Sequence, residues 1–133
     1  MDDQARALVR VRLERCKEDL GAAHLLMEHG KYRVAVNRVY YALFHLVSAA
    51  LSTLGVERRK HAGVEAAFNQ YLVKTGQVEP EYADIYRRAR RWREEADYSV
   101  SARFSEESAR DILTDAERFV VRLEEYLKSV DAL

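Results

Sequence analysis

The sequence predicts an all-α fold in which five helices form one bundle. Only one Pro and five Gly occur in 133 residues, β-branched residues are scattered, and apolar residues recur at steps of three and four. The length suits one ordinary domain, and no linker, repeat or low-complexity segment interrupts the chain. We therefore expect a single domain, with five helices accounting for the chain.

The first two helices are predicted from apolar periodicity and from the glycines that follow them. Residues 3–28 carry one apolar stripe, made of Val9, Leu13, Cys16, Leu20, Ala23 and Met27. Because Cys16 lies within this stripe, we expect a small core residue rather than a nucleophile. His29-Gly30 ends this helix, and the second is expected over about residues 31–54, followed by Gly55.

The remaining three helices are bounded by turn and capping residues. The third is expected over about residues 60–74, closing at Thr75-Gly76, and Pro80 suits the first turn of a fourth helix over about 80–97. Ser105 is a plausible N-cap for a last helix that runs to about residue 130. The apolar stripe of that helix is Ala109, Ile112, Ala116, Phe119, Leu123, Tyr126 and Val130.

Charge and cysteine content restrict the compartment and the partners. Lys plus Arg and Asp plus Glu both total 22, so the formal net charge is zero and any binding to nucleic acid needs a local patch. A single Cys excludes an internal disulfide framework and favours a reducing compartment. Residues 1–16 are charged throughout and lack the apolar core of a secretory signal. We therefore expect a cytoplasmic protein.

The apolar stretch over residues 39–56 reaches the lower length limit of a membrane span. It contains His45, two Ser and a Thr, with Gly55 near its end. An all-α protein also needs one fully packed central helix. We therefore expect a core helix and no membrane association.

The second helix has one wide apolar arc and an opposite arc without Glu or Lys. The apolar arc holds Val36, Val39, Tyr40, Leu43, Phe44, Leu46, Val47, Ala50, Leu51 and Leu54. The opposite arc holds Asn37, Arg38, Tyr41, Ala42, His45, Ser48, Ala49 and Ser52. Small residues in line with a Tyr, a His and an Arg suit three alternatives: a helix buried on both sides, a homodimer seam, or one wall of a ligand site.

The fourth helix carries five arginines within seven positions. Four share one broad face that could bind a phosphate backbone, although Glu94 and Glu95 favour a solvated, mixed-charge face: Arg87, Arg88, Arg90 and Arg91. Arg93 instead falls beside the apolar side, and Asp97 is well placed to pair with it. An arginine at the edge of a core is positioned either for structure or for a ligand.

The start of the third helix is a second candidate for anion binding. Arg58, Arg59, Lys60 and His61 surround its first turn, where free backbone N–H groups suit a phosphate, although such clusters are often simply solvated. No glycine-rich phosphate loop or metal-binding motif is present, and the four histidines lack the spacing that sets two ligands on one helical face. We expect no metal and no cofactor. The best acid–base candidates are His45, His61, Asp97 and Tyr98.

Three segments occur in an order that resembles the HEPN domain family: NRVYYALFH (37–45), KHAGVEAAFNQYLVKTG (60–76) and RRWREEADY (90–98). The resemblance covers roughly residues 8–128. It implies a five-helix, mostly antiparallel bundle that is often dimeric and often encoded beside a minimal nucleotidyltransferase as a toxin–antitoxin pair. Several branches of the family are metal-independent ribonucleases that use an Arg, a polar residue and a His four to six positions beyond the Arg.

The sequence departs from this ribonuclease pattern. Glu94 follows Arg93, and Tyr98 occupies the expected His position. The resemblance therefore implies a branch that binds a nucleotide, RNA or a protein partner. We predict the binding residues to be Arg38, Tyr41, His45, Lys60, His61, Arg93, Asp97 and Tyr98.

Two alternatives to the hypothesis of a nucleotide- or RNA-binding module stay open. One is a ribonuclease toxin that uses Arg93 or Arg38 with His45 or His61 as the acid–base group. The other is a dimeric adaptor without a ligand. By analogy with some members of the family, Tyr98 is also a conceivable acceptor for modification by a nucleotidyltransferase partner.

Overall fold

The computed structural model describes residues 1–101 and 103–133. Its elements are α1 (Asp3–Glu28), α2 (Tyr32–Ser52), α3 (His61–Phe68), the π-helix η1 (Asn69–Val73), α4 (Pro80–Tyr98) and α5 (Glu106–Ser129). The described residues form no strand. The predicted all-α bundle is therefore confirmed.

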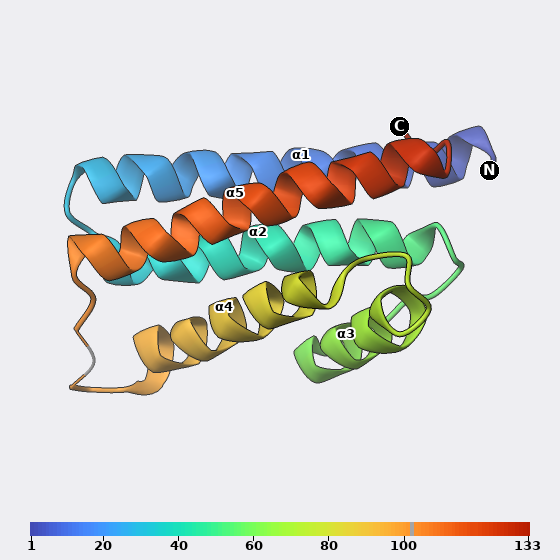
Figure 1. Ribbon diagram of the computed structural model, residues 1–133. Coiled ribbons are helices and arrows are strands. Elements are labelled where there is room, and N and C mark those ends of the chain that lie inside the picture. The colour runs from blue at the N-terminus through green and yellow to red at the C-terminus, as the bar shows by residue number, and fades with distance from the viewer. Residues whose placement is uncertain (102) are drawn as a thin grey trace.

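Helix α2 lies at the centre of the bundle and contacts each of the other α-helices. The chain reverses direction between α1 and α2 and again between α4 and α5, so that neighbouring helices are mostly antiparallel (Figure 1). By length and composition α2 could cross a membrane, but 61% of its most apolar window is buried inside the bundle. Its apolar residues therefore pack as the core helix that the sequence predicts.

One continuous core joins the helices. Its centre is aromatic: the Phe119 ring lies 5.8 Å from Phe68 and 6.2 Å from Tyr86, measured between ring centroids. Phe119, Phe68 and Tyr86 are fully buried and come from α5, α3 and α4. This cluster joins α3, α4 and α5, because its three rings come from segments far apart in the sequence.

The helix ends follow the predicted capping chemistry. Ser105 accepts a hydrogen bond from the Ser108 backbone N–H at 3.0 Å, as expected for an N-cap. Pro80 occupies the first turn of α4. Gly55 follows α2 with a φ of 70°, a left-handed conformation that a side chain would oppose.

The structure corrects two of the predicted helices in this part of the chain. The third helix changes to a π-helix after Phe68, and the Lys74 N–H donates to the Asn69 carbonyl five residues back, at 2.8 Å. The widened turn places Leu72 in the core. Helix α2 ends at Ser52, so Leu54 lies in the following turn and is 46% exposed, not in the core.

The predicted end and apolar stripe of the last helix are also corrected. Val130 lies beyond the end of α5 and is exposed, whereas Leu113 and Leu127, which the predicted stripe omits, are buried. The buried arc of α5 is therefore wider than a single line of residues, because α5 packs against α1, α2 and α4.

Truncation of the central aromatic cluster should destabilise the bundle strongly. We expect Phe119→Ala to lower the free energy of unfolding by about 3–5 kcal/mol, because it removes a buried ring and leaves a cavity. Val121→Ala on the same helix is the control, since Val121 is 59% exposed and should change stability by less than about 0.5 kcal/mol. Chemical denaturation measures both, and similar losses would contradict the packing described here.

Candidate functional site

The arginines of α4 differ in how their charge is compensated. Arg87 pairs with Asp84 at 2.7 Å, Arg88 pairs with Asp115 at 3.2 Å, and Arg90 pairs with Glu65 and Glu94. These three, with Arg91, make up the broad face predicted as a candidate for phosphate binding. Each of the three is already held by an acid, so they form a mixed-charge surface rather than a free cationic stripe.

Arg93 is placed differently, against aromatic rings. Its side chain is 11% exposed, and its Cζ atom lies 5.0 Å from the ring centroid of Tyr40 and 5.9 Å from those of Tyr41 and Tyr98. We call these three rings the tyrosine cage. The buried Nε atom of Arg93 has no hydrogen-bond partner among the described residues. The cage therefore compensates the cation by ring faces more than by hydrogen bonds.

A single acid accompanies this guanidinium. Asp97, one turn along α4, accepts from Arg93 at 3.3 Å, longer than the roughly 2.7–2.9 Å typical of charge-assisted bonds. Both Asp97 oxygens also accept from the Asn37 side-chain amide at 3.0 Å. Asp97 is thus shared between α2 and α4, and Arg93 keeps capacity for a further anion.

A chain of polar contacts continues from Asn37 to α1. The Asn37 side-chain oxygen accepts from the Arg38 Nε at 3.0 Å and from its Nη2 at 2.7 Å. Arg38 also lies 4.9 Å above the Tyr41 ring and 3.2 Å from Asp19. His45 Nε2 is 3.5 Å from the same Asp19 carboxylate. Burial lowers the pKa of His45 and Asp19 opposes that shift.

His61 joins the cage through Tyr40. Its Nδ1 lies 2.7 Å from the Tyr40 hydroxyl, and its ring stacks on Tyr40 and Phe44 at centroid distances of 5.5 Å and 4.8 Å. Burial raises the pKa of Tyr40, so the phenol stays protonated, and the His61 tautomer decides which of the two groups donates. Burial, and then the charge of Arg93, lowers the pKa of His61. The neutral form of His61 is therefore favoured, and Nε2 is the ring nitrogen that Tyr40 does not contact.

Most of the predicted binding residues come together in this region. Arg93, Asp97 and Tyr98 lie at the end of α4, and the ring of His61 lies 5.6 Å from that of Tyr41 in the cage, measured between centroids. Contacts through Asn37 and Asp19 add Arg38 and His45. Lys60 is exposed at the N-cap of α3, and no described contact joins its side chain to the others.

Three residues of the site were not predicted to belong to it. Asn37 was placed on the polar arc of its helix, Tyr40 was assigned to the core, and Asp19 was not singled out. Asn37 and Tyr40 lie within the NRVYYALFH segment, so the segment itself was the available signal. Asp19 is brought to α2 from another helix, and no local pattern marks it.

The neighbouring polar arc of α2 is covered by α1 of the same chain. Ala42 and Ala49 are fully buried, one turn from Arg38 and His45, whose side chains meet Asp19 of α1. The small residues therefore allow close approach of an intrachain helix.

Neither a cysteine nucleophile nor a metal centre is present in the part of the chain described. Cys16 is fully buried, and burial raises the pKa of its thiol to about 12. Residues 1–101 and 103–133 contain no group of three His, Cys, Asp or Glu side chains that could hold a metal ion.

Comparison with known proteins identifies the family. A family model described as HEPN domain matches residues 9–126. The chain belongs to the HEPN domain family. A UPF0332 protein of Thermotoga maritima is 40% identical over 116 residues, covering 87% of this chain and 88% of the relative. A protein of Methanocaldococcus jannaschii named "Putative toxin MJ0605" is 37% identical over 130 residues, covering 98% and 96% of the two chains. The predicted family resemblance is thus confirmed.

The proximity of Arg93 to His61 should be visible in the titration of the imidazole. We expect the His61 midpoint to lie below about 6.5 and to rise in Arg93→Ala, because a nearby cation disfavours the imidazolium. Histidine NMR signals followed against pH measure it. Arg118→Ala is the control: its exposed ion pair with Glu81 involves the first turn of α4, far from Arg93 along the helix. A midpoint unchanged by Arg93→Ala would contradict the arrangement.

Proposed function

We propose that this HEPN-domain protein binds a phosphate group of a nucleotide or RNA at the tyrosine cage. The observation that carries the proposal is Arg93, a nearly buried guanidinium held by three tyrosine rings with one long ion pair. Such a cation is costly to bury, and an anion that binds it offsets part of that cost. The α4 arginines that pair with acids at the surface are already compensated without a bound anion.

The surroundings of Arg93 supply the other contacts that a nucleotide requires. Tyr98 is 75% exposed and lines an open hollow with Arg91 and Arg93, so its ring is available to stack on a base. In the tautomer in which Nδ1 accepts from Tyr40, His61 offers an Nε2–H donor to a phosphate oxygen. Planar guanidinium groups bind phosphate with two parallel hydrogen bonds. One stacking ring and two donors form a minimal nucleotide site.

Binding suits this geometry better than RNA cleavage does. A general base needs an imidazole nitrogen with a free lone pair. In the tautomer in which Tyr40 donates to Nδ1, neutral His61 has no free lone pair, because Nε2 carries the proton. His45 is turned to Asp19, and Tyr98 occupies the position of the ribonuclease histidine in the family. We therefore favour a binding module over a ribonuclease.

The proposal extends to the partners. Two Methanocaldococcus jannaschii relatives carry names that include "Putative toxin", which supports a role for this chain in a toxin–antitoxin pair. The family resemblance supports a minimal nucleotidyltransferase as the protein partner and a homodimer as the working state. We place this pair in the cytoplasm, without a membrane or a cofactor.

Removal of the Arg93 side chain should weaken binding of ATP or of a short single-stranded RNA. We expect Arg93→Ala to raise the Kd by about tenfold or more, since a hydrogen bond to a charged group contributes about 1.5–3 kcal/mol. Titration calorimetry measures the affinity, and circular dichroism verifies that the helices are intact. Arg118→Ala is the charge-matched control and should leave the Kd unchanged.

Three results of this titration would redirect the proposal. Equal affinity in Arg93→Ala would exclude the cage as the site. Shortened RNA in the calorimeter cell would favour the ribonuclease. A dimer that binds neither ligand would favour the adaptor.

A further inference from the structure

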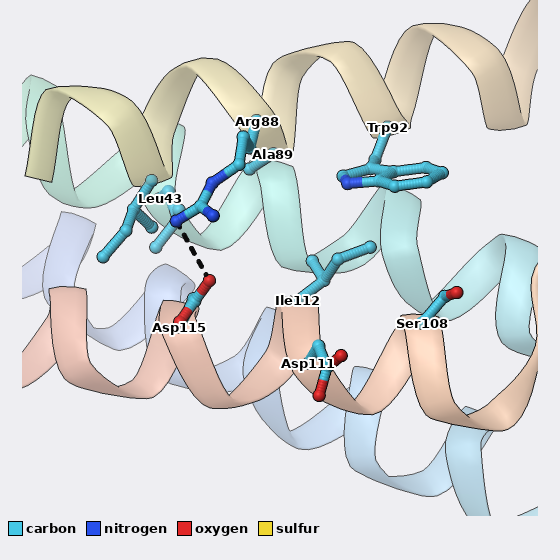
Figure 2. Close-up of a pocket in the computed structure, with 9 residues that line it drawn as sticks. Leu43, Arg88, Ala89, Trp92, Ser108, Asp111, Ile112 and Asp115 are labelled. Atoms are coloured by element: carbon cyan, nitrogen blue, oxygen red, sulfur yellow. Dashed lines mark ion pairs between the residues drawn. The ribbon is translucent and has the colours of Figure 1, made fainter. Parts of the chain in front are cut away.

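A small pocket opens between α4 and α5, away from the tyrosine cage. Its volume is about 150 Å³, similar to cavities that hold a benzene-sized group. Leu43, Ile85 and Ala89 lie at its base and are almost fully buried. Figure 2 shows the residues of α4 facing those of α5 across the opening. The pocket is thus a hollow with an apolar base, large enough for one side chain.

Trp92 of α4 and Ile112 of α5 also line the pocket (Figure 2). The Trp92 ring is held edge to face by Phe104, with ring centroids 5.3 Å apart. Trp92 and Arg93 are neighbours in sequence, but Trp92 lines this pocket while Arg93 lies against the tyrosine cage of α2. The pocket therefore presents a fixed indole, the aromatic ring that attracts cations most strongly.

The rim carries charges that are unequally compensated. Arg88 pairs with Asp115 at 3.2 Å, the ion pair drawn in Figure 2, and Arg118 approaches the same carboxylate at 3.7 Å. Asp111, one turn earlier on α5, is exposed, and no described residue forms a hydrogen bond or ion pair with it. The pocket thus has one unoccupied carboxylate on its α5 side, across the opening from the Trp92 indole on α4 (Figure 2).

We propose that this pocket receives an arginine side chain of a partner protein. The aliphatic stem of arginine suits the apolar base, and its planar guanidinium can stack on Trp92 while donating two hydrogen bonds to Asp111. An anionic group would meet Asp111 with the same sign of charge. A purely apolar group would leave that carboxylate unused and partly desolvated. This site does not depend on the function proposed for the tyrosine cage.

The surface around the pocket favours a protein as the source of this side chain. Phe104, which contacts Trp92, also lines a second hollow together with Val100 and Val34. Val100 is 93% exposed and Val34 is 49% exposed. Exposed apolar residues that continue from a charged pocket are typical of a protein interface, where an arginine often forms the central contact.

The single tryptophan gives a direct test. In an NMR spectrum of ¹⁵N-labelled protein, the only indole N–H signal belongs to Trp92, so it reports this pocket alone. We expect acetyl-Gly-Arg-Gly-amide to shift that signal saturably, with a Kd of about millimolar order for one isolated side chain. The same peptide with citrulline, which has the shape of arginine without its charge, should bind about tenfold more weakly.

Two variants on α5 separate the pocket from general electrostatics. Asp111→Asn should weaken the arginine peptide about tenfold, because it removes the charged acceptor. Glu107→Gln, the same charge change at another exposed position of the helix, should not alter the Kd. Neither substitution touches the core, so both proteins should fold.

Three results would overturn the proposal. The first is an indole signal that the arginine peptide leaves unshifted well above millimolar concentration. The second is equal binding of the citrulline peptide. The third is tighter binding of acetyl-Gly-Phe-Gly-amide, which would make the pocket an apolar one.

Discussion

The structure depends on the enclosure of α2 by the other helices. A helix surrounded in this way must present a different chemistry to each neighbour. Toward α1 it presents small residues, Ala42 and Ala49, together with Arg38 and His45, which meet Asp19. Toward the aromatic centre it presents large apolar residues. The candidate site lies where these two faces meet, because there a polar side chain can reach solvent from a rigid helix.

Tyr40 connects the packing to the chemistry at that boundary. Its ring is fully buried, its hydroxyl holds His61 and its face lies under Arg93. A cation–π contact of this kind contributes about 0.5–2 kcal/mol, and a hydrogen bond about 1 kcal/mol. Each of these two contacts is modest, but both are held in place by the Tyr40 side chain, which the surrounding core fixes. The site is therefore preorganised by packing, which reduces the ordering cost of binding.

Periodicity and capping predicted the helices well, because each depends on residues close in the sequence. The Arg93–Asp97 pair was predictable for the same reason, since its spacing follows from helix geometry. Asp19 was not, because it reaches α2 only after α1 folds back on it. Leu54 was misplaced because α2 ends two residues earlier than its apolar pattern predicts. The role of Tyr40 in the site was not predictable, since its position on an apolar arc does not show which residue its hydroxyl contacts.

The most direct measurement is the affinity of Arg93→Lys for ATP and for a short single-stranded RNA. This variant keeps the charge but loses the planar guanidinium, which lies against the tyrosine rings and has the geometry to bind phosphate through two hydrogen bonds. If the caged guanidinium is the binding group, Arg93→Lys should lose most of the affinity, as Arg93→Ala should. Wild-type affinity in Arg93→Lys would contradict the account, because charge alone would then explain binding.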